Sequence, residues 1–171
     1  VSLRTALAPR GCVGGRGEAV EVAVIRDAAL LARRETGAPA LAAGEPAPLR
    51  RASEDAAAIH LRQICTGGDP FGFGAARPLD FGHWAGHRLE ILSGHAIAHG
   101  QGVAVGMALD TVYAKRAGLL PEADAARVLA LIGALGLPRF LPELEMRRPD
   151  GELEVVRGIG DFREHLGGRL C

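Results

Sequence analysis

The segment from Gln101 to Ala117 has the residue pattern of an α-helix, yet it contains Gly102 and Gly106. Glycine inside a helix costs roughly 0.5–1 kcal/mol relative to alanine, because its backbone loses more freedom on folding. Such a helix is favoured only where a neighbouring element packs tightly against the glycines. Gly118 follows as a C-terminal stop signal. The sequence therefore predicts a helix with a closely packed partner.

Composition extends this expectation to the whole chain. Its 171 residues suggest one domain with a sizeable core. Hydrophobic residues make up 48% of the chain but aromatic residues only 4%, so Ala, Leu and Val supply most of the apolar surface. Ala and Leu are strong helix formers, and no alternation of strands and helices typical of a nucleotide-binding sheet is present. We therefore expect a mainly α fold.

Apolar spacing and turn residues divide the chain into expected elements. Helices are expected over residues 18–34, 49–65, 81–93, 101–117 and 121–135, with short helical pieces at 137–144 and 161–166 and a short strand at 152–156. Residues 36–48 and 66–80, rich in Pro and Gly, are expected to form loops. Residues 1–15 are expected to be an irregular N-terminal stub, followed by one helical domain over residues 16–171. Since the first residue is Val and the last is Cys171, we expect truncation at both ends.

Charge and cysteine content exclude several classes of function. The 20 basic residues balance 20 acidic ones without a basic stripe, which argues against nucleic acid and membrane surfaces as partners. The three cysteines are widely spaced, so neither a Cys-type zinc site nor a disulfide framework is expected. No apolar run approaches the ~20 residues of a membrane span, and the N-terminus lacks the apolar core of a signal peptide. We expect a cytoplasmic protein.

Four of the six histidines fall between residues 83 and 99. His83 and His87 are four residues apart, which places both imidazoles on one face of a helix. Such a pair can share a metal, or one can bind metal while the other contacts a substrate; two histidines on a solvated face are the alternative. Trp84 stands where the metalloprotease pattern HExxH has its glutamate, so peptide hydrolysis is not expected.

His99 begins the next expected helix, after a short link. Helices joined in this way are expected to be antiparallel, so a residue near the start of one can lie near the end of the other. Whether His99 reaches His83 is left open by the sequence. Imidazole and carboxylate ligands suit zinc, and three protein ligands leave a position open for chemistry. Glu18 is a candidate carboxylate at the start of a helix, where the helix dipole also favours a negative charge.

Three separated segments resemble one known family. PLDFGHWAGHRLE (78–90), followed by AHGQGVAVGMALD (98–110), resembles the signature of 3-dehydroquinate synthase and its sugar-phosphate cyclase relatives. GEAVEVAVIRD (17–27) resembles the helix that precedes this signature in the family. GGDPF (67–71), RPLDFGHW (77–84) and FREHLGG (162–168) resemble a dehydroquinate-synthase-like branch. The resemblance covers residues 16–168 and agrees with the sixteen-residue spacing between His83 and His99.

The resemblance implies site residues. The family's metal, Zn²⁺ or Co²⁺, would be bound by Glu18, His83 and His99. His87 would contact the substrate, and Asp80 and Arg77 would complete the catalytic residues. Arg163 falls near the family's C-terminal substrate lysine. The implied partner is a small-molecule sugar phosphate, and a homodimer is compatible with this reading.

The resemblance also implies a reaction. In the family, bound NAD oxidises a substrate hydroxyl, phosphate is eliminated, the ketone is reduced and the ring closes by an aldol step. The metal acts as a Lewis acid on the hydroxyl and ketone, while hydride transfer belongs to the cofactor. The family's NAD-binding α/β domain precedes the metal-binding domain and is expected to be absent here. We therefore expect a partial chain that is inactive alone.

Three positions depart from the family pattern. Glu21 stands where the family has a substrate-binding lysine, Gln101 replaces a glutamate and Asp80 replaces an asparagine. The charge reversal at Glu21 is expected to weaken binding of a substrate carboxylate or phosphate, so a related cyclisation or a decayed copy is an alternative to dehydroquinate formation. A non-catalytic metal-binding helical module and a polyol-dehydrogenase-like fragment are the other readings. HGQGVAVG and DPF favour the cyclase over the dehydrogenase.

Overall fold

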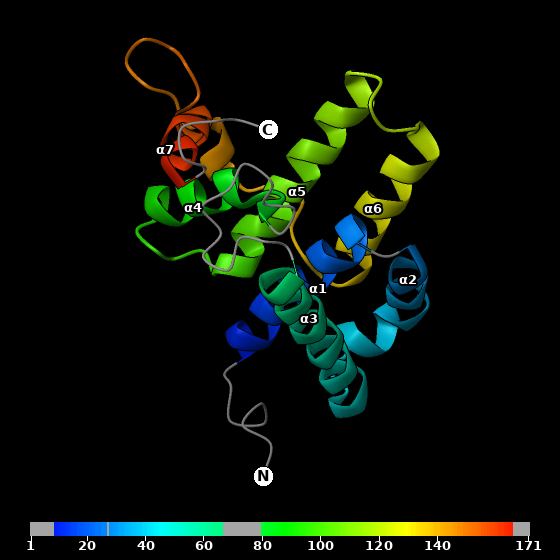
Figure 1. Cartoon of the computed structure of the whole chain (residues 1–171). Coiled ribbons are helices and arrows are strands. Elements are labelled where there is room, and N and C mark those ends of the chain that lie inside the picture. The colour runs from blue at the N-terminus through cyan, green and yellow to red at the C-terminus, as the bar shows by residue number, and fades with distance from the viewer. Residues whose placement is uncertain (1–8, 27, 67–79, 166–171) are drawn as a thin grey trace.

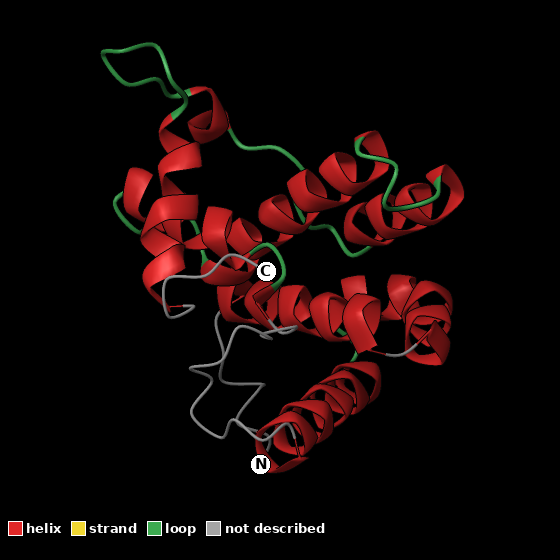
Figure 2. Cartoon of the chain, turned by 45° about the horizontal axis from the view of Figure 1, so that its top comes forward, coloured by secondary structure: helices red, strands yellow, loops and turns green. Residues whose placement is uncertain are grey.

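The computed structural model describes residues 9–26, 28–66 and 80–165, and the regular elements in these ranges are helical (Figures 1 and 2). The helices are α1 (Pro9–Arg26), α2 (Ala28–Ala42), α3 (Pro46–Thr66), α4 (His83–Leu92), α5 (His99–Arg116), α6 (Glu122–Ala134), the 3-10 helices η3 (Pro142–Glu145) and η4 (Glu154–Val156), and α7 (Arg157–His165). The expected mainly α class is confirmed. None of the described helices is long and apolar enough to cross a membrane.

Helix α5 lies at the centre of the fold. It packs against α1, α4 and α6, with α4 and α7 on one side and α6 on the other in Figure 1. Residues 102–108 of α5 are all buried, because neighbouring helices cover it on several sides. The main core joins α5 to α1, α2, α3 and α6, and its fully buried residues include Val20, Met107 and Ile132.

A second, smaller core holds the other side of α5. Leu89 of α4 and Val105 of α5 are fully buried there, and Leu144 of η3 and Val155 of η4 cover them. Arg88 of α4 forms an ion pair with Glu154 of η4. The C-terminal segment therefore fixes α4, the helix that begins at His83.

The two N-terminal loop predictions are wrong in part. Helix α1 begins at Pro9, so residues 9–15 are helical rather than irregular. The expected loop at 36–48 is mostly helix, because α2 continues through Pro39 to Ala42 and α3 begins at Pro46. Proline removes one helical hydrogen bond, but Ala38 and Leu41 beside it are buried in the main core. Burial of these apolar side chains offsets the missing bond.

The strand expected at 152–156 is also wrong. One antiparallel bridge joins Arg147 to Leu153 across a turn at Gly151, whose φ is 87°. Residues Glu154–Val156 then form η4. Burial of Val155 against α4 and α5 turns the chain away from an extended path.

Candidate metal centre

Two pairs of glycines bring α4 and α5 into backbone contact. A Cβ atom added at Gly106 would lie 1.9 Å from the carbonyl oxygen of Gly82, and one at Gly102 would lie 2.9 Å from that of Gly86. The order of the pairs shows that the helices are antiparallel. The close partner predicted for Gly102 and Gly106 is therefore the helix that carries His83 and His87.

Asp110 of α5 holds the beginning of α4. Its carboxylate accepts hydrogen bonds from the backbone N–H of Gly82 (3.0 Å) and from Nε1–H of Trp84 (2.9 Å). Burial raises the pKa of Asp110, although these two hydrogen bonds act to lower it. Because the donors lie on either side of His83, Asp110 fixes the backbone from which that imidazole projects.

A third glycine contact brings α1 to the beginning of α5. A Cβ atom at Gly17 would lie 2.6 Å from the carbonyl oxygen of Gly100. Gly17 directly precedes Glu18, and Gly100 directly follows His99. The backbones of these two predicted ligands are therefore brought close, while the Glu18 side chain lies outside the part of the chain that the structure describes.

Three imidazoles converge at this junction. The ring centroids of His83 and His99 are 5.2 Å apart, those of His87 and His99 5.3 Å, and those of His83 and His87 5.7 Å. His83 is the most buried, with 11% of its side chain exposed, whereas His87 exposes 51%. His95, the fourth histidine between residues 83 and 99, is exposed in the turn between α4 and α5, with a φ of 63°. Thus the open side of the cluster is at His87.

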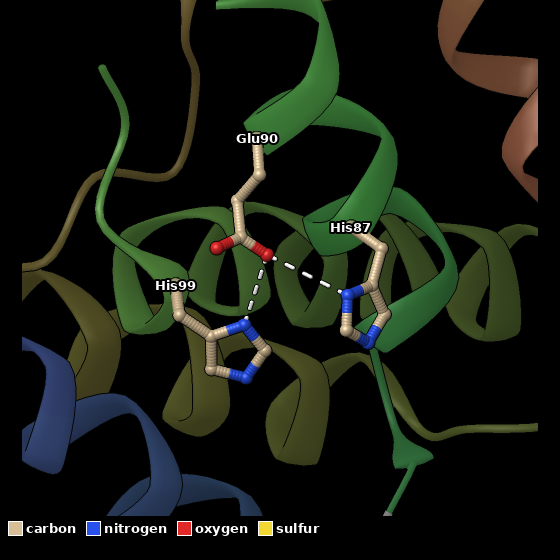
Figure 3. Close-up of side chains that lie close together, drawn as sticks. All are labelled: His87, Glu90 and His99. Atoms are coloured by element: carbon tan, nitrogen blue, oxygen red, sulfur yellow. Dashed lines mark hydrogen bonds and ion pairs between the residues drawn. The ribbon is translucent and has the colours of Figure 1, made fainter. Parts of the chain in front are cut away.

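Glu90 lies between two of these histidines (Figure 3). Its Oε2 is 3.0 Å from Nδ1 of His99 and 3.5 Å from Nδ1 of His87. A carboxylate accepts a hydrogen bond, so this contact favours the His99 tautomer with a proton on Nδ1. The Nε2 atom then carries the lone pair that a metal requires. Sequence reasoning missed Glu90, although its position three residues after His87 places it on the same helix face.

Glu21 of α1 lies in ion-pair contact with His83. The Glu21 side chain is fully buried, and its Oε1 lies 3.3 Å from Nδ1 of His83. Position 21, where the family has a substrate-binding lysine, thus carries a carboxylate that lies next to the predicted metal ligand His83.

The structure describes the side chains of only some of the other residues that the sequence singled out. Asp80 is half-buried in the turn before α4. Arg77 lies outside the described residues, and Arg163 has its backbone in α7 but its side chain outside them. Gln101 caps α5, since its Oε1 accepts a hydrogen bond from the backbone N–H of Ala98 (3.1 Å).

The donor chemistry suits a divalent transition metal. Imidazole nitrogens and carboxylate oxygens are the ligands of zinc sites, and their partners orient them. Two ligand sets are available from these residues: the set implied by the resemblance, and the set of His87, Glu90 and His99, whose donor atoms lie within 4.8 Å of one another. The second set uses the Glu90 oxygen already engaged by Nδ1 of His99.

Comparison of the sequence with known proteins shows which family the chain belongs to. The family described as 3-dehydroquinate synthase C-terminal matches residues 15–153. The chain belongs to this family. It is 31% identical over 170 residues to a 3-dehydroquinate synthase of Jannaschia sp. (strain CCS1), covering 96% of this chain and 44% of the relative. A 2-epi-valiolone synthase of Actinosynnema mirum is 37% identical over 170 residues, covering 98% of this chain and 43% of the relative.

A solved structure shares the fold of this family member. It is ValA, a 2-epi-5-epi-valiolone synthase from Streptomyces hygroscopicus subsp. jinggangensis 5008 with NAD⁺ and Zn²⁺ bound. The TM-score is 0.78 at 26% sequence identity, over 95% of this chain and 43% of that chain. The chain therefore spans less than half the length of the relatives that it matches.

Proposed function

We propose that this chain forms the metal- and substrate-binding part of a sugar-phosphate cyclase, with Zn²⁺ or Co²⁺ bound by Glu18, His83 and His99. The observation that carries the proposal is the convergence of His83 and His99 from two helices, with a carboxylate at Nδ1 of each. Contact between Gly17 and Gly100 supports Glu18 as the third ligand, because it brings the neighbouring backbones together. Membership of the 3-dehydroquinate synthase C-terminal family supports the reaction class.

The chain's own residues have distinct parts in this reaction. A divalent ion bound here would supply Lewis acidity to a substrate hydroxyl or ketone oxygen. His83 and His99 would hold the ion, and Glu90 would orient His99. His87, about half exposed at the open side of the cluster, would contact the substrate and accept or donate a proton at its imidazole.

NAD would be bound by another part of the enzyme. Among the described residues there is no β-sheet and therefore no strand–turn–helix unit of the kind that holds a dinucleotide. A structurally similar protein, ValA, binds NAD⁺ together with Zn²⁺. We therefore assign the hydride-transfer cofactor to a domain that completes this site from outside the described residues.

The substrate that fits best is a seven-carbon sugar phosphate without a carboxylate. A glutamate in place of the family's lysine at position 21 changes the local charge by two units in the negative direction. Coulomb repulsion of about 1 kcal/mol or more per nearby charge pair would then oppose each negative group of the substrate, so a substrate with a phosphate alone is favoured over one with a phosphate and a carboxylate. The higher identity to the 2-epi-valiolone synthase of Actinosynnema mirum (37%) than to the 3-dehydroquinate synthase of Jannaschia sp. (31%) supports this choice.

Phosphate release tests the proposal. The chain would be fused in frame to the part of the Actinosynnema mirum 2-epi-valiolone synthase that it does not match, and supplied with NAD⁺ and Zn²⁺. We expect phosphate release from a carboxylate-free heptulose phosphate, weaker release from a carboxylated one, and none from the same fusion with His83→Ala. A folded, zinc-loaded fusion that releases no phosphate from either substrate would instead favour a non-catalytic metal-binding module.

A further inference from the structure

Among the carboxylates that the structure describes near the candidate metal centre, Glu21 is the more completely buried of two. Its side chain is 0% exposed, whereas Glu90 retains 19% exposure. Burying a carboxylate is expensive unless it is paired or hydrogen-bonded. One partner is Nδ1 of His83, in an ion-pair contact at 3.3 Å.

The two carboxylates stand in matching relation to two histidines. Glu90 approaches Nδ1 of His99 at 3.0 Å, and Glu21 approaches Nδ1 of His83 at 3.3 Å. The first is a hydrogen bond and the second an ion-pair contact. A carboxylate beside Nδ1 favours a proton on that atom, which leaves the lone pair on Nε2. We propose that Glu21 is a positioning residue that fixes the tautomer and ring orientation of His83 and thereby strengthens metal binding. The proposal rests on the proposed metal centre.

This role gives position 21 a chemistry that a lysine cannot supply. A lysine ammonium is a donor with no acceptor, so it cannot accept the Nδ1 proton of a histidine. The burial of Glu21 also separates it from solvent, and α1 directs it toward His83. Position 21 would therefore serve the metal through His83 instead of binding an anionic part of the substrate.

Zinc affinity is the first test. Two variants form a graded series: Glu21→Gln removes the charge but keeps an acceptor oxygen, and Glu21→Leu removes both the charge and the acceptor while keeping the approximate volume. Loss of a supporting hydrogen bond to a ligand typically weakens metal affinity by ~10- to 100-fold. We expect this loss in Glu21→Leu and a smaller one in Glu21→Gln, measured by competition with a chromophoric chelator. Glu35→Gln, which alters a surface ion pair with Arg127, is the control that should match wild type.

Thermal unfolding without metal separates positioning from a purely structural role. Glu21→Gln removes a buried charge but keeps an acceptor for the Nδ1 proton of His83, so the Tm of the metal-free variant should stay close to that of wild type. Glu21→Leu leaves this proton without an acceptor and should lower the Tm, so the zinc affinity of Glu21→Gln is the measurement that a purely structural role would not change. Unchanged zinc affinity in both variants would overturn the proposal. Complete loss of zinc in Glu21→Gln would also overturn it, since Glu21 would then be a ligand itself.

The tautomer of His83 provides a readout that does not need metal. Long-range ¹H–¹⁵N spectra of the metal-free protein should show the His83 proton on Nδ1 in wild type and lose this state in Glu21→Leu. If wild type binds no zinc, the proposed metal centre fails while this measurement still tests the Glu21–His83 contact. The same His83 tautomer in wild type and Glu21→Leu would contradict that contact.

Discussion

The contact between α4 and α5 leads to a strong prediction about Gly106. Replacing it with alanine would place a Cβ atom 1.9 Å from the carbonyl oxygen of Gly82. An ordinary van der Waals contact requires at least 3.4 Å, so the two backbones must separate by 3.4 − 1.9 = 1.5 Å at this point. Neither partner atom belongs to a flexible side chain, so the helices themselves must move.

The expected cost follows from two opposing effects. Overpacking a filled interior costs about 1–3 kcal/mol and more when backbone must shift, while alanine gains about 1 kcal/mol in helix propensity over glycine. We expect Gly106→Ala to lower the free energy of unfolding by about 2 kcal/mol or more. For a chain of this size that corresponds to a fall in Tm of roughly 4–8 °C. Separation of α4 from α5 should also weaken zinc binding, since His83 and His99 lie on different helices.

Gly37→Ala is the matched control. Gly37 is also inside a helix, α2, but nothing lies within 4 Å of its added Cβ atom. The same substitution should therefore stabilise the protein by about 0.5–1 kcal/mol. Urea and thermal unfolding followed by circular dichroism compare the two. If Gly106→Ala stabilised the protein as Gly37→Ala does, α4 and α5 would not be in backbone contact.

Two further predictions concern carboxylates that hold the site. Glu90→Gln should lower zinc affinity by ~10- to 100-fold while leaving one zinc bound at saturation; loss of all zinc would make Glu90 a ligand. Burial raises the pKa of Asp110, so its carboxyl group ionises less readily in the folded than in the unfolded protein. The contribution of Asp110 to the free energy of unfolding should therefore fall as the pH rises from about 3.8 through the folded pKa. Asp110→Asn should lack this slope, and equal pH profiles of the two proteins would refute the assignment.

Local sequence features predicted much of the fold. The low aromatic content and the helical spacing correctly predicted a mainly α chain, and Gly102 and Gly106 correctly predicted a close neighbour. The helical conformation within 36–48 could not be predicted, because the burial of Ala38 and Leu41 that keeps α2 helical depends on distant helices. Boundaries near Pro39 were decided by tertiary packing rather than by local preference.

The candidate site was predictable where its residues share one helix. Spacing placed His83 and His87 on one face, and it could have placed Glu90 there as well. The approach of His99 required the antiparallel crossing of α4 and α5, which the glycine contacts fix. Glu21 lies on α1, sixty-two residues before His83, and no local pattern indicates that their side chains meet.

The assignment of the metal ligands is tested most directly by zinc content in matched histidine variants. Wild type, His83→Ala, His87→Ala and His60→Ala would be loaded with Zn²⁺, dialysed and analysed for metal per folded chain. His60 of α3 contacts the backbone oxygen of Ala56 and serves as the control histidine. We predict about one zinc in wild type, His87→Ala and His60→Ala, and almost none in His83→Ala. Retention of zinc by His83→Ala with its loss from His87→Ala would contradict this account and place the ion on His87, Glu90 and His99.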